Sequence, residues 1–270
     1  YSDPEIKFLG TDAAMTQFVN EAGRRNPLYE TEIMVLGDNP NLVLSNTLLR
    51  FMNDKGDIGR LDALFSYPEQ GGGHKGLDQG NYNDPNEPTG TNSSYYSKPA
   101  FSPFDPVYLM SATESYLLQA EAIIRFNVAS YADAKELYQK AIDKAFNRLG
   151  FESGESFYSP GQPYEFPSEG SMLNEFIRSI IIQKWVSLAN IQSLETFFEH
   201  NRTHYPEESP VPASDNNYVP GEFTVSVNNV TSGRFPKRLI FPETEYSGNP
   251  NTPAKKQVYD KIWWDAKVDD

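Results

Sequence analysis

The pattern of apolar and polar residues between Tyr108 and Leu149 predicts two amphipathic helices joined by a short turn. Apolar residues recur at intervals of three and four in both halves of this stretch, which gathers them on one face of each helix. Ser130 stands where an N-cap residue is expected for the second helix, and Gly150 follows its end. We therefore predict a helical hairpin over residues 108–150.

The second predicted helix carries a more particular pattern. Ala134, Tyr138 and Ala141 have the small–aromatic–small spacing that is typical of the second helix of a tetratricopeptide-type unit. The small residues let two helices approach closely, and the aromatic ring fills the space above them. A single unit is too short to stack as a free solenoid, so we expect the hairpin to belong to a larger helical body.

The rest of the chain contains one further strong helical pattern, and long irregular stretches separate the predicted elements. The apolar face over residues 171–204 predicts a long helix, and weaker helical patterns occupy residues 11–19 and 41–52. Alternation over residues 223–227 predicts a short strand. Residues 66–101 and 151–170 are long loops rich in Gly, Pro and aromatic residues, and residues 207–270 form an irregular C-terminal region. The expected fold class is mainly α, a tetratricopeptide-like helical scaffold with long irregular loops and few short strands, in a single domain over residues 1–270.

Composition narrows the classes of function. The net charge of −14 argues against binding to nucleic-acid backbones. The chain has no cysteine, which excludes disulfides, thiol catalysis and thiolate metal sites, and the sequence gives no reason to expect a cofactor. No apolar run approaches the length of a membrane span, and no signal peptide is visible. Because the chain begins with Tyr1, we expect a mature form or a piece of a longer protein.

Four segments, taken in order, resemble one known family. They are MSATESYLLQAEAIIRFN at 110–127, QKWVSLANIQSLETFFEHNRTHYP at 183–206, RFPKRLIFPETEYSGNPNTP at 234–253 and IWWD at 262–265. Together they resemble the C-terminal portion of the SusD/RagB family of outer-membrane nutrient-binding lipoproteins of Bacteroidetes. The family's Arg-Arg-Thr-Gly-Tyr-Pro stretch is replaced here by Asn201 to Pro206, which keeps Arg202 and Thr203 but lacks the first Arg and the Gly.

The resemblance implies a function without bond chemistry. Members of the family capture a nutrient at the cell surface, usually an oligosaccharide and sometimes a peptide. They deliver it to a TonB-dependent SusC-like β-barrel transporter. The resemblance also implies that the complete protein is surface-exposed on the outer membrane and anchored by a lipid on an N-terminal Cys that is not present in this chain.

The two long loops offer the residue types that bind sugars. Pyranose rings present C–H faces that stack on aromatic rings, and their hydroxyls hydrogen bond with Asn, Asp, Gln and Arg. The alternative is that these aromatic residues simply pin long loops to the body. The candidate ligand-binding residues are Tyr82, Asn83, Tyr95 and Tyr96 in the first loop and Tyr158 and Tyr164 in the second.

Other large or charged residues have structural interpretations. Trp185 lies at core spacing, and Trp263-Trp264 is expected to pack the tail onto the body. Glu121 and Arg125 are four residues apart on a helix and predict a local ion pair. The remaining charged set is expected to clamp the helix end to the tail: Arg202, Arg234, Arg238, Glu243 and Glu245.

Two rival functions remain open at the level of sequence. One is a helical scaffold that binds only protein, with the loops as its interface. The other is a hydrolase, for which Asp84 with Glu87, or Glu152 with Glu155, would have to face each other across a cleft. His200 and His204 lack the H-E-x-x-H order, so a zinc site is not expected, and no catalytic residue is predicted.

Overall fold

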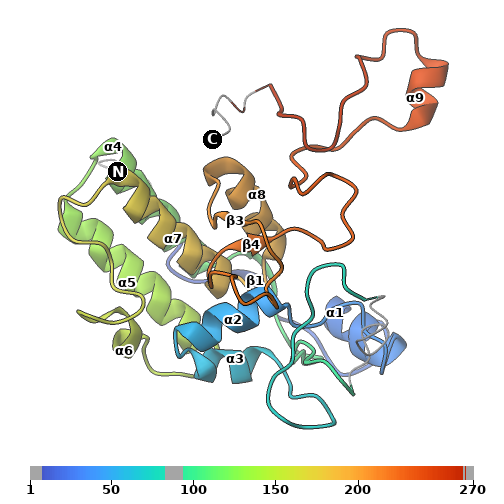
Figure 1. The fold of residues 1–270 in the computed structure, drawn as a ribbon. Helices are drawn as coiled ribbons and strands as arrows, with labels where there is room; N and C mark the ends of the chain where they lie inside the picture. The colour runs from blue at the N-terminus through green and yellow to red at the C-terminus, as the bar shows by residue number, and fades with distance from the viewer. Residues whose placement is uncertain (1–7, 83–93, 264, 266–270) are drawn as a thin grey trace.

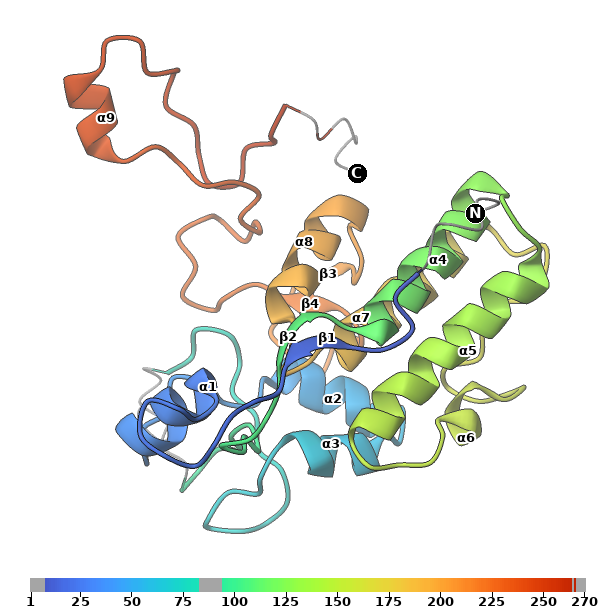
Figure 2. The same cartoon turned by 180° about the vertical axis from the view of Figure 1, so that it is seen from behind.

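Three helices lie side by side in the body of the protein (Figures 1 and 2). The structure, a computed structural model, describes residues 8–82, 94–263 and 265. Helix α4 (Ala112–Phe126) packs along α5 (Tyr131–Arg148) and also contacts α7 (Leu173–Ser187), while α8 (Ser193–Thr203) lies against α7. The predicted helical hairpin is therefore present as α4 and α5, and the mainly α fold class is confirmed.

Local capping defines the ends of the hairpin helices. The Ser111 side chain accepts a hydrogen bond from Glu114 N, and Ser130 and Asp133 form a reciprocal capping box at the start of α5. Asn127 ends α4 in the left-handed conformation, with φ at 52°. Short polar residues favour such positions because they satisfy backbone groups that the helix leaves unpaired.

The tetratricopeptide-type packing in α5 is confirmed. Ala134, Tyr138 and Ala141 are all buried in the core between the helices. The Tyr138 hydroxyl donates to Tyr164 O at 3.1 Å, so the buried polar end of this ring is satisfied. Burial raises the pKa of Tyr138 far above its ordinary value.

The N-terminal end of the hairpin differs from the prediction. Residues 107–110 form strand β2 (Val107–Met110), which pairs antiparallel with β1 (Ala13–Met15), so the helix begins only at Ala112. The helix predicted over residues 11–19 is absent, because this stretch is drawn into the β1–β2 ladder. Asp12 Oδ1 accepts a hydrogen bond from Ala112 N at 2.7 Å, and so assists the start of α4 rather than starting a helix of its own.

The single helix predicted over residues 171–204 is also wrong. It is divided into α7 and α8 by a turn in which Asn190 adopts φ of 64°. The apolar pattern continues through the break because Leu188 remains fully buried. The Asn190 side chain donates to Leu64 O at 2.9 Å. This hydrogen bond joins residues 126 positions apart in the sequence and holds the turn in place.

Short elements surround this body. Helices α2 (Asn46–Asp54) and α3 (Ile58–Leu64) lie across one end of α5 and α7 (Figure 1). The predicted strand near residue 223 is present but brief. The remaining short elements are α1 (Pro27–Tyr29), the π-helical turn η1 (Glu30–Val35), α6 (Glu155–Tyr158), and the parallel pair β3 (Glu208–Ser209) and β4 (Phe223–Thr224). In the part of the chain that the structure describes, no helix is long and apolar enough to cross a membrane.

Charged side chains join the helices of the body. The buried Lys184 ammonium on α7 lies 2.9 Å from a Glu114 oxygen on α4 and 3.2 Å from a Glu199 oxygen on α8. Arg202 on α8 donates two hydrogen bonds of 2.7 Å to Glu121 on α4. The predicted Glu121–Arg125 pair is present as well, at 2.6 Å.

The predicted clamp to the tail is therefore wrong. Arg202 is used within the body, whereas Arg234 lies over the Tyr259 ring at 3.5 Å and Glu243 pairs with Lys255 at 2.6 Å. These last contacts are confined to the C-terminal region.

That C-terminal region projects from the body. In both views the segment that contains α9 (Glu243–Gly248) extends away from the helices (Figures 1 and 2). Lys237 N and Arg238 N donate to Val258 O, so the segment closes on itself. Trp263 is 94% exposed, which contradicts the prediction that the Trp pair packs the tail onto the body, and Trp264 lies outside the described residues.

Candidate functional site

The loop predicted over residues 66–101 has a fixed stem. At the stem, Ser66 N donates to Lys98 O and Ala100 N donates to Leu64 O, both at 2.9 Å. These bonds place the two ends of the loop next to each other, directly after α3. Loops whose backbone groups are satisfied in this way hold their side chains in defined positions.

A second set of backbone contacts fixes the middle of the loop. Residues 75–77 hydrogen bond both to residues 44–46 and to Ser97. Gly76 lies against residue 46 so closely that a Cβ atom would come within 2.8 Å of Asn46 N. Only glycine fits this approach without displacing the backbone.

Three residues of this loop and one residue of α3 form what we name the Tyr67 platform: Tyr67, His74 and Ser97 from the loop, and Asp62 from α3. The Tyr67 ring is 53% exposed, and its other face stacks on the His74 ring with the centroids 4.2 Å apart. The Tyr67 hydroxyl donates to Asp62 Oδ1 at 2.7 Å, and His74 Nε2 lies 2.9 Å from the same oxygen. His74 Nδ1 lies 3.0 Å from Ser97 Oγ. The ring is therefore held on one face and at its hydroxyl.

These contacts also set the charge of the platform. The hydrogen bond from Tyr67, followed by the contact with His74, lowers the pKa of Asp62 below its ordinary value. The same hydrogen bond raises the pKa of Tyr67. At neutral pH the platform therefore presents an uncharged aromatic ring beside an ionised carboxylate.

Asp62, His74 and Ser97 have the residue types of a hydrolytic triad, but a substrate could not reach the serine. Ser97 is fully buried, and its hydroxyl oxygen accepts a hydrogen bond from Lys75 N at 3.2 Å. A nucleophile must reach the carbon that it attacks. This arrangement therefore supports binding at the exposed ring and not nucleophilic catalysis by Ser97.

The predicted residues of the first loop fall into three groups. Tyr82 is exposed at 52%, and Tyr95 is half-buried. Tyr96 is buried at 4% exposure, so its ring does not present a face to a ligand in this structure. Asn83 lies outside the described residues, as do Asp84 and Glu87 of the hydrolase alternative.

The second loop is used mainly for packing. Tyr164 is buried, stacks on Phe157 and donates to Asp57 at 2.8 Å, which is at odds with the prediction that it contacts a ligand. Tyr158 is half-buried and donates to Asp143 at 3.0 Å. In both views this loop, beside α6, lies on the other side of α2 and α3 from the Tyr67 platform loop, so the two predicted surfaces are not brought together (Figures 1 and 2).

Sequence reasoning placed Tyr67 in the loop but did not assign it a role. Its partners Asp62 and His74 are five and seven residues away, on opposite sides, and match no motif. The density of Gly around residues 71–73 was the available signal that the loop turns back on itself. Among the described residues, no group of three or more histidine and acidic side chains is arranged to hold a metal ion.

The structure is thus a helical body with a tetratricopeptide-type hairpin, and it carries an exposed aromatic platform beside α3. The family model for SusD-like proteins, described as starch-binding and associating with the outer membrane, matches residues 9–224. The chain belongs to this SusD-like family, which confirms the resemblance drawn from the sequence.

Solved structures show the same fold. A SusD homologue from Bacteroides fragilis is 18% identical with a TM-score of 0.65, and the match covers 94% of this chain and 56% of that one. A homologue from Bacteroides thetaiotaomicron is 23% identical with a TM-score of 0.66, covering 95% and 57%. A chitin-binding homologue from Flavobacterium johnsoniae is 20% identical with a TM-score of 0.63, covering 92% and 54%.

The chain thus spans a little over half the length of these solved structures. No curated protein sequence gives a significant match.

Proposed function

We propose that this chain is part of a cell-surface protein that binds an oligosaccharide at the Tyr67 platform and delivers it to a TonB-dependent SusC-like transporter. The observation that carries the proposal is the exposed Tyr67 ring, held by His74 and Asp62 on a loop with a fixed stem. Membership of a family described as starch-binding supports a glycan as the ligand. The chitin-binding homologue is a further precedent for a polysaccharide.

The geometry of the platform suits a pyranose ring. The free face of Tyr67 offers an apolar plane for the C–H face of the sugar. Both protein donors use Oδ1 of Asp62, and within the described residues Oδ2 has no donor, so it remains to accept a sugar hydroxyl. Because the ring is already fixed, binding costs little additional side-chain entropy.

We also propose where the complete protein acts. The family's association with the outer membrane supports a surface location for the complete protein. The anchor that we propose is a lipid on an N-terminal Cys. Binding and release without bond chemistry is the mechanism that we assign to it. Copurification of the complete protein with a β-barrel transporter tests the delivery step, and its absence under conditions that preserve membrane complexes would remove that step from the proposal.

Isothermal titration against soluble starch, chitin oligosaccharides, other polysaccharides and peptides tests the binding function. For the glycan that binds, we expect Tyr67→Ala to weaken the affinity about tenfold, a loss of about 1.4 kcal/mol. Phe126→Ala is the control, because Phe126 is an exposed aromatic residue at the end of α4, outside the platform. It should leave the affinity unchanged.

Two outcomes would count against this function. Equal affinities of the wild-type chain and the Tyr67→Ala variant would remove the platform from the site. Binding of peptides but of no glycan would favour the peptide-binding alternative.

A further inference from the structure

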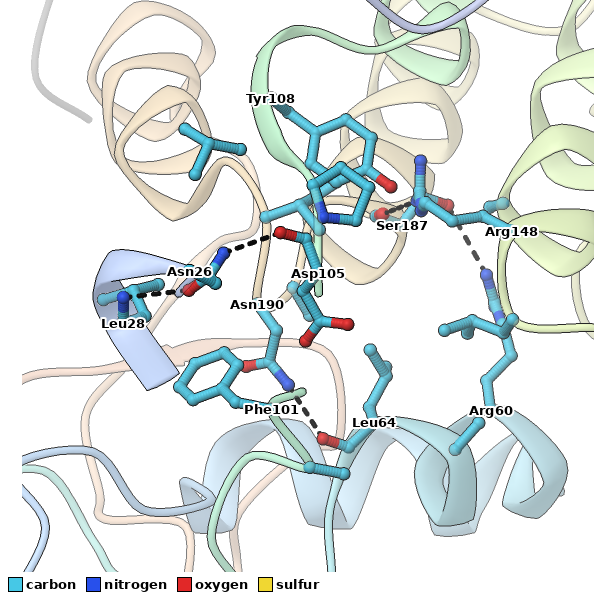
Figure 3. A pocket seen from close by; sticks show the side chains of 18 of the residues that line it. Asn26, Leu28, Arg60, Leu64, Phe101, Asp105, Tyr108, Arg148, Ser187 and Asn190 are labelled. Atoms are coloured by element: carbon cyan, nitrogen blue, oxygen red, sulfur yellow. Dashed lines mark hydrogen bonds between the residues drawn. The ribbon is translucent and has the colours of Figure 1, made fainter. Parts of the chain in front are cut away.

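A pocket away from the Tyr67 platform has the volume of a small-molecule site. It measures about 330 Å³ and lies between α1, α3, α5, the α7–α8 turn and the segment before β2 (Figure 3). Ala145 and Val186 on its walls are buried, whereas Leu28 and Val107 are exposed. The pocket is therefore deep and open to solvent, and its volume lies within the range of about 300–1,000 Å³ that small ligands occupy.

The two arginines that line this pocket offer no free charge to a ligand. Arg60 is buried and pairs with Asp57, to which it donates from Nε at 2.8 Å. Arg148 donates from Nη2 to Ser187 O at 2.5 Å, its Nη1 is buried, and the Asp12 carboxylate stabilises its charge. Both cations are therefore already offset by groups of the protein itself.

Asp105 is the charged residue of the pocket that has no counter-ion among the described residues. Its Oδ2 accepts a hydrogen bond from Ser102 N at 2.7 Å, which leaves Oδ1 without a donor in the described part of the chain. In contrast to Arg148 Nη1, this oxygen is not sealed from solvent. In Figure 3 the Asp105 carboxylate points into the middle of the pocket. The pocket therefore presents a half-buried negative charge that a ligand can reach.

The other unpartnered polar groups of the pocket can act as acceptors. The Asn190 side chain donates to Leu64 O at 2.9 Å, and its Oδ1 has no donor among the described residues. The Tyr108 hydroxyl makes no hydrogen bond with them either, and burial raises its pKa, so it stays uncharged at neutral pH. In Figure 3 Asp105 lies between these two side chains. Such a set suits an ammonium group, which carries three donors and no acceptor.

The walls around these groups are largely apolar. They include the side chains of Leu64, Phe101, Leu149, Val186 and Ile191. An apolar body gains free energy when it leaves water for such walls, whereas a polyhydroxylated ligand would lose hydration without enough replacement hydrogen bonds. The lining therefore favours an ammonium group on an apolar body, and the Phe101 ring offers a flat wall for an aromatic one.

We propose that the pocket binds a small arylalkylammonium, with its nitrogen at Asp105 and Asn190 and its ring against Phe101. The same chemistry occurs in a free amine and at the N-terminus of a peptide that begins with an aromatic residue. The net charge of −14 attracts cationic ligands toward the protein. The pocket shares no residue with the Tyr67 platform, so this proposal and the glycan proposal succeed or fail separately.

The test is a titration of the full chain at pH 7 with phenethylamine, phenethyl alcohol and hydrocinnamate, which share one aromatic body and differ in charge. We expect saturable binding of the amine, about tenfold weaker binding of the alcohol and still weaker binding of the acid, because the Asp105 carboxylate attracts only the amine. The proposal is overturned if the alcohol or the acid binds as tightly as the amine, or if the amine does not bind.

Two further ligands distinguish the source of the amine: phenylalanyl-glycinamide and its N-acetylated form. Binding of the dipeptide as tightly as phenethylamine, with loss of binding on acetylation, assigns the pocket to peptide N-termini. Weaker binding of the dipeptide than of phenethylamine assigns it to free amines. Equal binding of the dipeptide and its acetylated form contradicts the role given to the ammonium group.

Asp105→Asn locates the charge. Its amide oxygen can still accept the hydrogen bond from Ser102 N, but the negative charge is gone. We expect about tenfold weaker binding of phenethylamine and unchanged binding of phenethyl alcohol, a split that general damage to the pocket would not produce. An unchanged Kd for the amine overturns the assignment.

Asp260→Asn is the matched control for this variant. Asp260 is also half-buried and accepts a hydrogen bond from the backbone N of the residue three positions earlier, Gln257, but it belongs to the C-terminal segment and not to the pocket. It should leave both affinities unchanged.

Phe101→Leu provides an independent readout if Asp105→Asn does not fold. It removes the aromatic wall and keeps the carboxylate. We therefore expect several-fold weaker binding of the amine and of the alcohol, with the ratio of their affinities preserved. Unchanged affinity for phenethylamine overturns the place given to the ligand ring.

Discussion

Glu121 illustrates how individual residues hold this fold together. Its side chain is buried, and its carboxylate accepts two hydrogen bonds from Arg202 and one from Arg125. Burial by itself raises the pKa of Glu121, but the bonds from the two arginines outweigh burial and bring the pKa below its ordinary value of 4.5. A carboxyl group whose pKa falls on folding stabilises the folded state above its unfolded pKa, and this contribution is lost as the pH falls through the folded pKa.

We expect Glu121→Gln to lower the free energy of unfolding by about 2 kcal/mol at pH 7, because a partly buried ion pair loses one partner while the 40% exposed Arg202 side chain can still be hydrated. The deficit should shrink as the pH falls from about 4.5, the pKa of the unfolded state, through the lower pKa of the folded state, where the wild-type carboxylate is protonated as well. Urea unfolding at pH 7 and pH 3.5 measures both effects.

The control for this variant is Glu136→Gln on α5, whose pair with Lys140 is exposed. It should change the free energy of unfolding by less than about 0.5 kcal/mol. A deficit in Glu121→Gln that stays constant with pH would show that the carboxylate charge is not the source of its contribution.

Of the two arginines that contact Glu121, one was predictable from the sequence. Glu121 and Arg125 are four residues apart on a helix, so their pairing follows from local geometry. Arg202 lies 81 residues from Glu121, and the sequence placed it with the tail. Which of several distant carboxylates an arginine meets depends on how α8 packs, and no local pattern contains that information.

At the scale of elements, the start of α5 was predictable, whereas the start of α4 and the division between α7 and α8 were not. Ser130 caps α5 through contacts within three residues, which sequence spacing shows directly. The turn at Asn190 depends on a hydrogen bond to Leu64 and on a left-handed backbone. The apolar period runs through this turn because Leu188 packs in the core as a helical residue would.

Two substitutions at Asn190 separate its two contributions. Asn190→Gly keeps the left-handed backbone accessible and loses only the hydrogen bond, so we expect a loss of about 1 kcal/mol in the free energy of unfolding. Asn190→Ala also strains the backbone and should cost about 1–2 kcal/mol more. Thermal and urea unfolding of both variants measure the difference, and an Ala variant as stable as the Gly variant would exclude backbone strain at this turn.

On the scale of the whole molecule, the helical body and the C-terminal segment contribute unequally to stability. The segment closes on itself at Lys237 and Val258, and Leu239 within it is 94% exposed. Replacing residues 239–257 with a short Gly-Ser linker should therefore shift the unfolding midpoint of the body by less than about 2 °C. Differential scanning calorimetry measures this shift. A fall of about 5 °C or more would show that the segment supports the body.

The binding surface was predictable as a region and not as a set of residues. Loop composition indicated residues 66–101, where the Tyr67 platform lies. The same composition drew attention to Tyr96 and Tyr164, which the core covers. An aromatic residue in a loop can face solvent or serve as the anchor of that loop, and the choice depends on neighbours such as Asp57 that are far away in sequence.

The stem of the platform loop has a consequence for evolution and for engineering. Its two ends meet at Leu64 and Ala100, where backbone hydrogen bonds join them whatever side chains lie between. The contacts of residues 75–77 with residues 44–46 and with Ser97 fix the second half of this loop, so exchange is confined to the segment between Ser66 and His74. Since the entropy of closing a loop grows only slowly with its length, this segment can be exchanged or extended at modest cost in stability. Grafting the corresponding segment of a relative between these fixed points therefore offers a route to a new sugar specificity without redesign of the helices.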